Sequence, residues 1–293
     1  MQKIPQVDRL ASPMYFFFAD DARQIHPTRD RMQALVGIGG FSVQADKLRP
    51  LEIALETICT DAGFPSGEEF KWSPPKNRWM RENLVGETRL KFFLRVVETL
   101  AAHQVVMTLV ASDTDCATAT DAGSHELDVT QMYLERAHIQ LKHAGTEGIV
   151  IVDRPGGGSR DEQKFLISCV EFVEKGSNYV RPDRFAVNVL CGSSSLIRCL
   201  QAADLVASCG LARIGGETNF SPPVFDAMKP LLHKNRWGYR GGSGLKLHPD
   251  GKFRNLYYWL LGEKEYVRGN TGTPIPAPEL PYKDDDGTPK KGA

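Results

Sequence analysis

Asp153 has the strongest potential for chemistry of any residue in this sequence. It directly follows Gly148-Ile-Val-Ile-Val152, a run typical of a strand buried in a parallel sheet. Open α/β sheets place their ligands at the carboxyl ends of such strands, so an acid at this point suits a functional role. A loop carboxylate or a helix cap is the structural alternative for Asp153.

A second acid, Asp204, lies within a predicted helix over residues 195–214, close to the face that carries Ile197 and Leu211. A carboxylate in an apolar stripe is costly unless it is paired, hydrogen-bonded or bound to a metal. Gln201 lies near the same face and is positioned to support it. A salt bridge to a buried arginine is the structural alternative for Asp204.

Two further acids follow the apolar and aromatic run Met14-Tyr-Phe-Phe-Phe18, which predicts a core strand ending at Ala19-Asp20-Asp21. Carboxylates from two strand ends and a helix can converge on a cation. Oxygen ligands suit Mg²⁺ or Mn²⁺ better than zinc, and paired ions of this kind serve phosphoryl transfer. The acids therefore predict chemistry on a phosphodiester, provided that they meet in the fold.

Basic residues supply candidate phosphate contacts. Arg154-Pro-Gly-Gly-Gly-Ser-Arg160 could present Arg154, Arg160 and backbone amides to a phosphate at a helix start, although it lacks the G-K-[ST] ending of a P-loop. A solvated turn is the alternative. Residues 71–81 and 233–240, the latter with Arg236 and Arg240, mix cations with aromatic rings. Such mixtures build single-strand grooves, but they also occur on ordinary surfaces.

The positioning elements follow from hydrophobic periodicity and breaker residues. We expect strands over 14–18, 34–43, 105–112, 148–152 and 185–190, and helices over 48–62, 83–103, 128–142, 159–174, 195–214 and 222–232, with residues 69–72 extended. A hairpin followed by alternating strands and helices predicts a mixed sheet covered by helices. Gly37, Gly39 and Gly40 fail the dinucleotide-binding spacing, so they predict a close approach of another backbone.

Composition narrows the class of protein. The 293 residues carry 36 Lys and Arg against 36 Asp and Glu, so any attraction to nucleic acid must be local. No apolar run is long enough to span a bilayer, and the six cysteines form no C-x-x-C pair, so we expect a cytoplasmic protein with reduced thiols. One domain is expected over residues 1–268, followed by a flexible tail over 269–293.

Taken together, four motifs resemble the family described as domain of unknown function 3800. They are Phe-Phe-Ala-Asp20-Asp21, Glu69-Phe-Lys71-Trp72, Ile-Val-Asp153 and Leu200-Gln-Ala-Ala-Asp204-Leu, and they span roughly residues 14–215. The last motif is the most distinctive. Where the family usually has Asp-Glu-Ser in its first strand, this chain has Asp20-Asp21-Ala22, and Glu68 stands next to Glu69.

The resemblance implies an α/β, ribonuclease-H-like mixed sheet flanked by helices, with an inserted helical segment, and a metal-dependent nuclease activity in phage defence or a mobile element. Carried over residue by residue, it implies that Asp20, Glu69, Asp153 and Asp204 hold Mg²⁺ or Mn²⁺ while Lys71 steadies the transition-state phosphate. DNA or RNA would be the partner, with no membrane involved.

Two other function classes stay open. A catalytically silent nucleic-acid-binding protein could keep the fold and the basic patches while Asp21-Ala22 weakens metal affinity. A structural or regulatory partner of a neighbouring defence protein is the third possibility. Metal titration separates the nuclease from both, because only the nuclease requires a site-dependent divalent ion.

Overall fold

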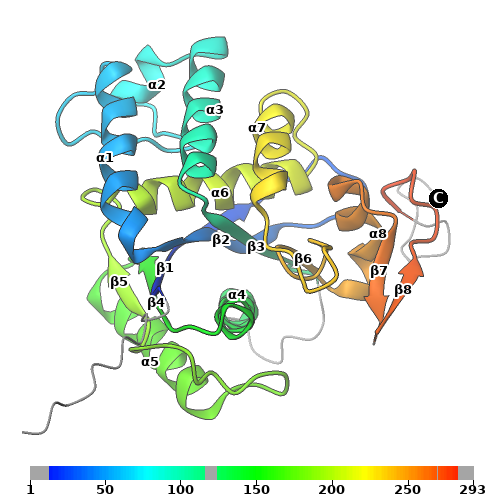
Figure 1. Cartoon of the computed structure of the whole chain (residues 1–293). Coiled ribbons are helices and arrows are strands. Elements are labelled where there is room, and N and C mark those ends of the chain that lie inside the picture. Colours follow the sequence, from blue (N-terminus) through cyan, green and yellow to red (C-terminus); the bar gives the residue numbers. More distant parts are fainter. Residues whose placement is uncertain (1–12, 116–123, 269, 283–293) are drawn as a thin grey trace, which may run out of the picture.

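The computed structural model describes residues 13–115, 124–268 and 270–282, and its centre is a six-stranded mixed sheet (Figure 1). The strand order is β5 (Leu190–Gly192), β4 (Gly148–Asp153), β1 (Tyr15–Gln24), β2 (Leu35–Gln44), β3 (Val106–Asp113) and β6 (Leu245–His248). β2 is antiparallel to both of its neighbours, and the other adjacent pairs are parallel. The predicted hairpin and the α/β class with a mixed, helix-covered sheet are confirmed.

Helix α6 (Arg198–Ile214) lies directly on one face of the sheet, over β1 and β2. Beyond it stand α1 (Ala45–Asp61), α3 (Gly86–Ala102), α7 (Ser221–Met228) and the short α2 (Trp79–Asn83), with a 3-10 turn over Lys229–Leu231. Helices α1 to α3 form a segment inserted between β2 and β3. The larger apolar core fills this side of the sheet.

A close approach between α6 and β2 confirms the prediction from the glycines of the second strand. A Cβ atom on Gly39 would lie 2.7 Å from the Cα atom of Ala207, and one on Gly37 would lie 2.6 Å from a methyl group of Leu211. These distances are shorter than carbon atoms tolerate, so glycine is what lets the helix settle onto the strand.

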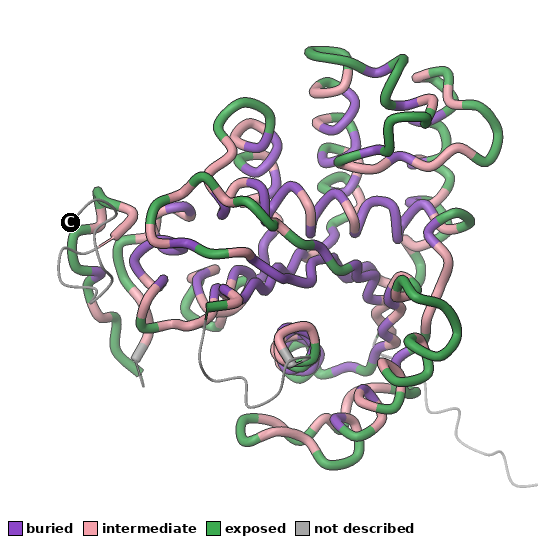
Figure 2. Tube along the Cα trace, turned by 180° about the vertical axis from the view of Figure 1, so that it is seen from behind, coloured by how far each residue is buried: buried purple, intermediate pink, exposed green. Residues whose placement is uncertain are grey.

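The opposite face is covered by α4 (Ser124–Ala144), which packs on β2 and β3, and by α5 (Ser159–Lys175). A second apolar core lies between these helices and the sheet. In Figure 2, α4 is seen end-on beside the strands. The sheet therefore separates two distinct layers of helices.

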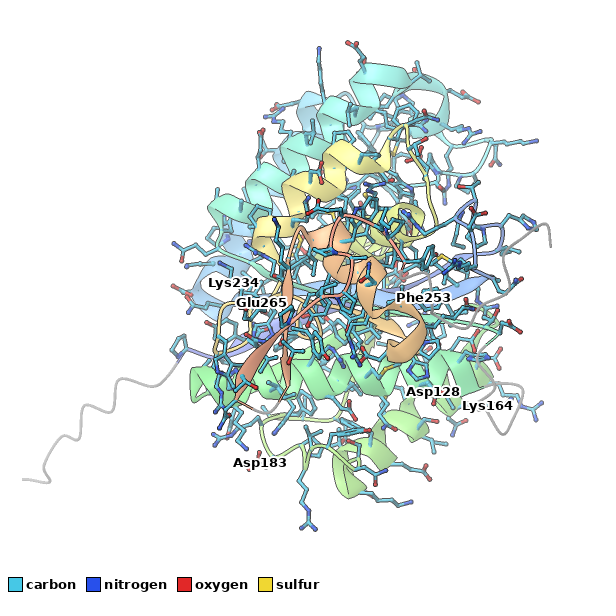
Figure 3. All side chains as sticks on the ribbon, turned by 90° about the vertical axis from the view of Figure 1, so that its right-hand side faces the viewer. Asp128, Lys164, Asp183, Lys234, Phe253 and Glu265 are labelled. Atoms are coloured by element: carbon cyan, nitrogen blue, oxygen red, sulfur yellow. The ribbon has the colours of Figure 1, made fainter. Side chains whose placement is uncertain are left out.

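The C-terminal part completes the β6 end of the molecule with α8 (Asp250–Leu261) and a hairpin of β7 (Glu265–Arg268) and β8 (Thr271–Pro274). Figure 3 looks onto this side and shows Phe253 of α8, which is fully buried. The expected tail therefore does not begin at residue 269, because β8 pairs with β7 and Ile275 is buried. Residues 269 and 283–293 lie outside the described part of the chain.

Several element boundaries differ from the sequence prediction. β1 does not end at Asp20 and Asp21 but continues to Gln24, because the first half of β2 pairs with it. The strand expected over 185–190 pairs with β4 only at its ends, through a single bridge of Phe185 with Gly148 and through β5, while residues 186–188 are exposed. Helix α5 starts at Ser159 as expected and ends at Lys175, one residue beyond the predicted end.

The start of α6 is set by a contact distant in sequence. A serine cap near Ser195 is expected from the sequence, but the helix begins at Arg198. Its N-cap residue is Ile197, whose apolar side chain cannot accept a hydrogen bond from the helix. The carboxylate of Glu52 in α1 instead accepts the backbone N–H groups of Arg198 and Cys199, at 3.1 and 2.9 Å. These otherwise unsatisfied amides are a preferred position for an anion.

Four cysteines, Cys59, Cys169, Cys199 and Cys209, are buried free thiols, and Cys191 is half-buried. Cys116 lies outside the described residues. Over the described ranges, no helix is both long enough and apolar enough to cross a membrane.

Candidate functional site

Asp20 and Asp153 occupy matched positions on neighbouring strands. Ala19 pairs with Val152 in the parallel ladder, and each aspartate is the next residue of its strand. Because side chains alternate along a strand, both aspartates share a face with the residues two positions earlier, which pack into the core beneath α6. The two carboxylates are therefore presented to the same helix.

Asp204 is supplied by that helix and is held in place by two donors. The backbone N–H of Trp72 donates to its Oδ2 atom at 2.8 Å, and the Ser208 hydroxyl donates to its Oδ1 atom at 3.0 Å. Neither donor is an arginine, and Arg198, the buried arginine of α6, pairs with Glu56 at 2.7 Å. The salt-bridge alternative for Asp204 therefore does not apply.

Residues 69–72 owe their position to the same face of α6. The side-chain oxygen of Gln201 accepts a hydrogen bond from the backbone N–H of Phe70 at 3.2 Å. Two residues later, the N–H of Trp72 donates to Asp204. Gln201 and Asp204 are three residues apart, so both lie on one face of the helix, where they bind alternate amides of the segment. This explains how a stretch that belongs to no strand is positioned beside the acids.

The loop before α6 fixes Asp153. The backbone N–H of Ser194 donates to its Oδ1 atom at 2.9 Å, and the Gln201 side chain donates to the Ser194 carbonyl at 2.6 Å. Gln201 thus links the loop beside Asp153 with the segment beside Asp204. The support role predicted for Gln201 is confirmed, although it acts through backbone groups of both segments.

Lys71 carries positive charge into this group of acids. Its Nζ atom lies 3.5 Å from a carboxylate oxygen of Glu69. Burial acts to lower the pKa of Lys71, but Glu69, Asp204, Asp20 and Asp153 together outweigh burial and raise it. Lys71 is therefore a cation at neutral pH, and Glu69 joins the site as its ion-pair partner.

Asp20 is the most perturbed acid of the group. Burial is the largest cause that holds its pKa well above the ordinary value, followed by repulsion from Asp204 and Asp153. Its side chain accepts no hydrogen bond or ion pair from the described residues, although Asp20 is only 7% exposed. Burial likewise raises the pKa of Asp204, against the lowering effect of its bonds from Trp72 and Ser208.

Asp21 lies on the other side of the sheet from these acids, although its charge still adds to the raised pKa of Asp20. It follows Asp20 in β1 and therefore points to the other face of the sheet, where it is exposed on the side of the Arg23–Glu126 ion pair. The sequence prediction of two carboxylates delivered together is wrong for this reason. A strand that continues past both residues separates their side chains.

The oxygen atoms of these carboxylates are the type of ligand that a hard divalent cation such as Mg²⁺ prefers. One of these carboxylates, that of buried Asp20, lacks any protein donor. In their described positions, no three His, Cys, Asp or Glu side chains are grouped so that they could hold one ion. The metal assignment for Asp20, Glu69, Asp153 and Asp204 remains a prediction.

The four arginines expected to contact nucleic acid do not form one surface. Arg154 follows Asp153 but pairs with Glu162 at 2.9 Å, and Arg160 is exposed at the start of α5. Arg236 stacks 4.0 Å from the Trp237 ring, whereas Arg240 lies 3.9 Å from Glu263, whose carboxylate also accepts its backbone N–H. Of these four, Arg154 directly follows Asp153, whereas Arg236 and Arg240 lie at the β7 end of the molecule.

The basic and aromatic stretch over residues 71–81 is mainly structural. Trp72 packs against Phe93 at 5.1 Å between ring centroids, and Trp79 packs against Phe64 at 4.8 Å. Both tryptophan rings therefore pack against aromatic side chains of the helical insertion, and this packing competes with stacking on nucleic-acid bases. The amides of Phe70 and Trp72, which sequence reasoning missed, could have been inferred from the spacing of Gln201 and Asp204.

Comparisons with known proteins do not assign this arrangement of residues to a family. No protein-family model matches the chain, and no curated protein is significantly similar to it. The resemblance described above therefore depends on the four motifs alone.

Proposed function

We propose that this protein is a metal-dependent nuclease with a ribonuclease-H-like fold, related to the domain of unknown function 3800 family. The observation that supports the proposal is the electrostatic coupling of Asp20, Asp153 and Asp204 on the α6 side of the sheet, with Lys71 as their shared counter-charge. Acids of like charge held close together, with Asp20 buried among them, lower the stability of the fold unless a cation binds to them.

In this proposal, Asp20, Asp153 and Asp204 would hold Mg²⁺ or Mn²⁺, with Glu69 as a further ligand. A divalent ion held there would supply Lewis acidity toward a phosphodiester oxygen and toward the attacking water. Lys71, charged at neutral pH, donates to the phosphate oxygens on which negative charge grows in the transition state.

The remaining residues keep the acids oriented. Ser194 holds one oxygen of Asp153, while Trp72 and Ser208 each hold one oxygen of Asp204. Ligands fixed by such hydrogen bonds lose less freedom when a cation binds. Arg160, exposed in the first turn of α5, is available for the phosphate backbone.

Substitution of the acids tests the proposal. Asp153→Asn and Asp204→Asn keep the size of the side chain but remove the charge that holds a cation, so each should lower metal-dependent cleavage by roughly 100-fold or more. Single- and double-stranded DNA and RNA are assayed with Mg²⁺ and with Mn²⁺. Asp21→Asn is the matched control, since Asp21 faces the other side of the sheet and should retain cleavage.

Two outcomes would contradict the proposal. If either variant cleaves a substrate as fast as the wild type, the acid concerned is not part of the site. If the wild type binds nucleic acid but cleaves none with either ion, the catalytically silent binding protein is the better description.

A further inference from the structure

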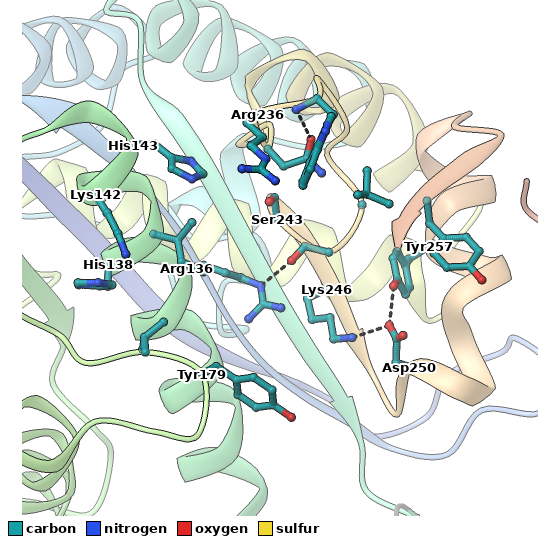
Figure 4. Close-up of a pocket in the computed structure, with 18 of the residues that line it drawn as sticks. Arg136, His138, Lys142, His143, Tyr179, Arg236, Ser243, Lys246, Asp250 and Tyr257 are labelled. Carbon is teal, nitrogen blue, oxygen red and sulfur yellow. Dashed lines mark hydrogen bonds and ion pairs between the residues drawn. The ribbon is translucent and has the colours of Figure 1, made fainter. Parts of the chain in front are cut away.

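A large cleft lies away from the acids, on the α4 side of the sheet and beside the edge strand β6 (Figure 4). Its volume is about 1310 Å³. It is bounded by the C-terminal half of α4, the loop after α5, the loop around Asn235 and the start of α8.

The lining of the cleft is strongly basic in a chain without net charge. Seven arginines and lysines line it against two aspartates, an excess of five positive charges. Asp250 neutralises Lys246 and Arg254, each at 2.5 Å. Lys142 and Arg181, both exposed, have no carboxylate partner among the described residues. Positive charge focused in a concave surface attracts an anion.

Arg136 gives the cleft a fixed donor at its base. Its side chain is only 12% exposed, and it donates to the carbonyl groups of Gly242 and Met132, at 3.1 and 2.7 Å. Its Nη2 atom donates no hydrogen bond within the described part of the chain. Figure 4 shows the guanidinium of Arg136, the ammonium of Lys246 and the ring of Tyr179 around one space.

Aromatic rings complete the surface. Tyr179 is 84% exposed and Trp237 is 42% exposed, so both rings are accessible to a ligand in the cleft. Trp237 already has the Arg236 guanidinium 4.0 Å from its ring centroid. Bases stack on rings of this kind, while the neighbouring cations neutralise the phosphates.

We infer that this cleft binds a single strand of nucleic acid, with its phosphates along Arg136, Lys142 and Arg181 and with a base on Tyr179. The volume favours a strand over one nucleotide, because pockets for small molecules measure about 300–1000 Å³. The inference goes beyond the proposed nuclease, since the cleft lies on the other face of the sheet from the acids and needs no metal to bind.

Binding of a fluorescein-labelled 12-nucleotide strand, as DNA and as RNA, is followed by anisotropy in EDTA, so cleavage plays no part. The double variant Lys142→Glu/Arg181→Glu should weaken binding by roughly tenfold or more and reduce the salt slope by about 1.4. Lys91→Glu/Arg95→Glu on α3 is the matched control, with the same charge change at two exposed positions outside the cleft, and it should bind as the wild type does.

Tyr179 tests stacking separately from charge. Tyr179→Ala should weaken binding about fivefold or more, whereas Tyr179→Phe, which keeps the ring, should not. Heparin, a polyanion without bases, should compete equally for the wild type and Tyr179→Ala. Equal affinity of both Tyr179 variants would overturn the stacking role, and a bare polyanion site would replace the strand.

The whole inference is wrong if the wild type binds neither strand, or if the charge reversal in the cleft affects binding no more than the α3 control. Those results are independent of the nuclease. If the wild type cleaves but the cleft variants bind as it does, only the inference about the cleft is refuted. If the wild type binds in the cleft but never cleaves, only the proposed nuclease activity is refuted.

Discussion

At the scale of single residues, the acids beneath α6 are a group that folding alone does not favour. Asp20 is buried, accepts no bond from the described residues and is repelled by Asp204 and Asp153. A carboxylate in this position lowers stability whenever it is charged and no cation is present. Burial is the largest cause of the raised pKa of Asp20, and repulsion from Asp204 and Asp153 adds to it.

Removal of the Asp20 charge should therefore stabilise the metal-free protein. In EDTA at pH 7, Asp20→Asn should melt at least about 2 °C above the wild type, since each kcal/mol shifts the midpoint of a chain this long by roughly 2–4 °C. Added Mg²⁺ should raise the wild-type midpoint more than that of the variant, because binding stabilises only the protein that holds the ion.

The exposed Asp30 provides the control for this substitution, and Asp30→Asn should melt with the wild type under both conditions. Differential scanning calorimetry gives all six midpoints. A destabilised Asp20→Asn protein that gains as much from Mg²⁺ as the wild type would identify Asp20 as a structural acid and would remove it from the metal site.

At the scale of elements, the fit of α6 onto β2 sets where Asp204 stands relative to the strands. Gly39 pairs with Asp20 in the hairpin and also lies beneath Ala207, so one residue controls the spacing between the helix and the acids. A methyl group there has no room, because its nearest neighbours are backbone atoms that no rotamer change can move.

Gly39→Ala should thus cost about 1–3 kcal/mol of unfolding free energy and should also reduce cleavage, since the helix must lift with Asp204. Urea unfolding measures the first effect and the nuclease assay the second. Gly251→Ala in α8, where a Cβ atom would meet nothing within 4 Å, should be neutral or slightly stabilising. Unchanged stability of Gly39→Ala would show that α6 can shift without cost.

The same element scale explains what sequence alone could and could not predict. Asp153 and Asp204 carry local signals, a β-branched run and an apolar stripe, and both are found where those signals place them. The Glu52 cap of α6 has no local signal, because it joins positions 146 residues apart. β6 is only four residues long and is a strand because it pairs with β3. Hydrophobic periodicity could not identify so short a segment.

At the scale of the whole molecule, the sheet separates a negative site from a positive one. The acids lie under α6, while the basic cleft lies beside α4 and β6. The cancelling charges of the sequence hide this separation, which arises only when elements distant along the chain are brought together. Arg136 and Tyr179 were missed for this reason, since neither lies in a basic run.

The positive side also affects the acid stability of the whole fold, through a buried histidine. His233 is 8% exposed and lies 6.4 Å from His143 between ring centroids. Burial, followed by His143 and Arg136, lowers its pKa to about 4. Between pH 6.5 and about 4, His233 therefore binds a proton in the unfolded chain but stays neutral in the folded protein. The free energy of unfolding falls as the pH falls through this window.

Replacement of this histidine should flatten that part of the stability profile. Across the window, the wild type should lose up to about 3 kcal/mol more unfolding free energy than His233→Gln, which cannot titrate. Urea unfolding in steps from pH 7 to pH 4 measures the difference, and His26→Gln at an exposed position should follow the wild-type curve. Parallel curves for the wild type and His233→Gln would mean that His233 takes up its proton in the folded state, which requires the α4 contact to open before the molecule unfolds.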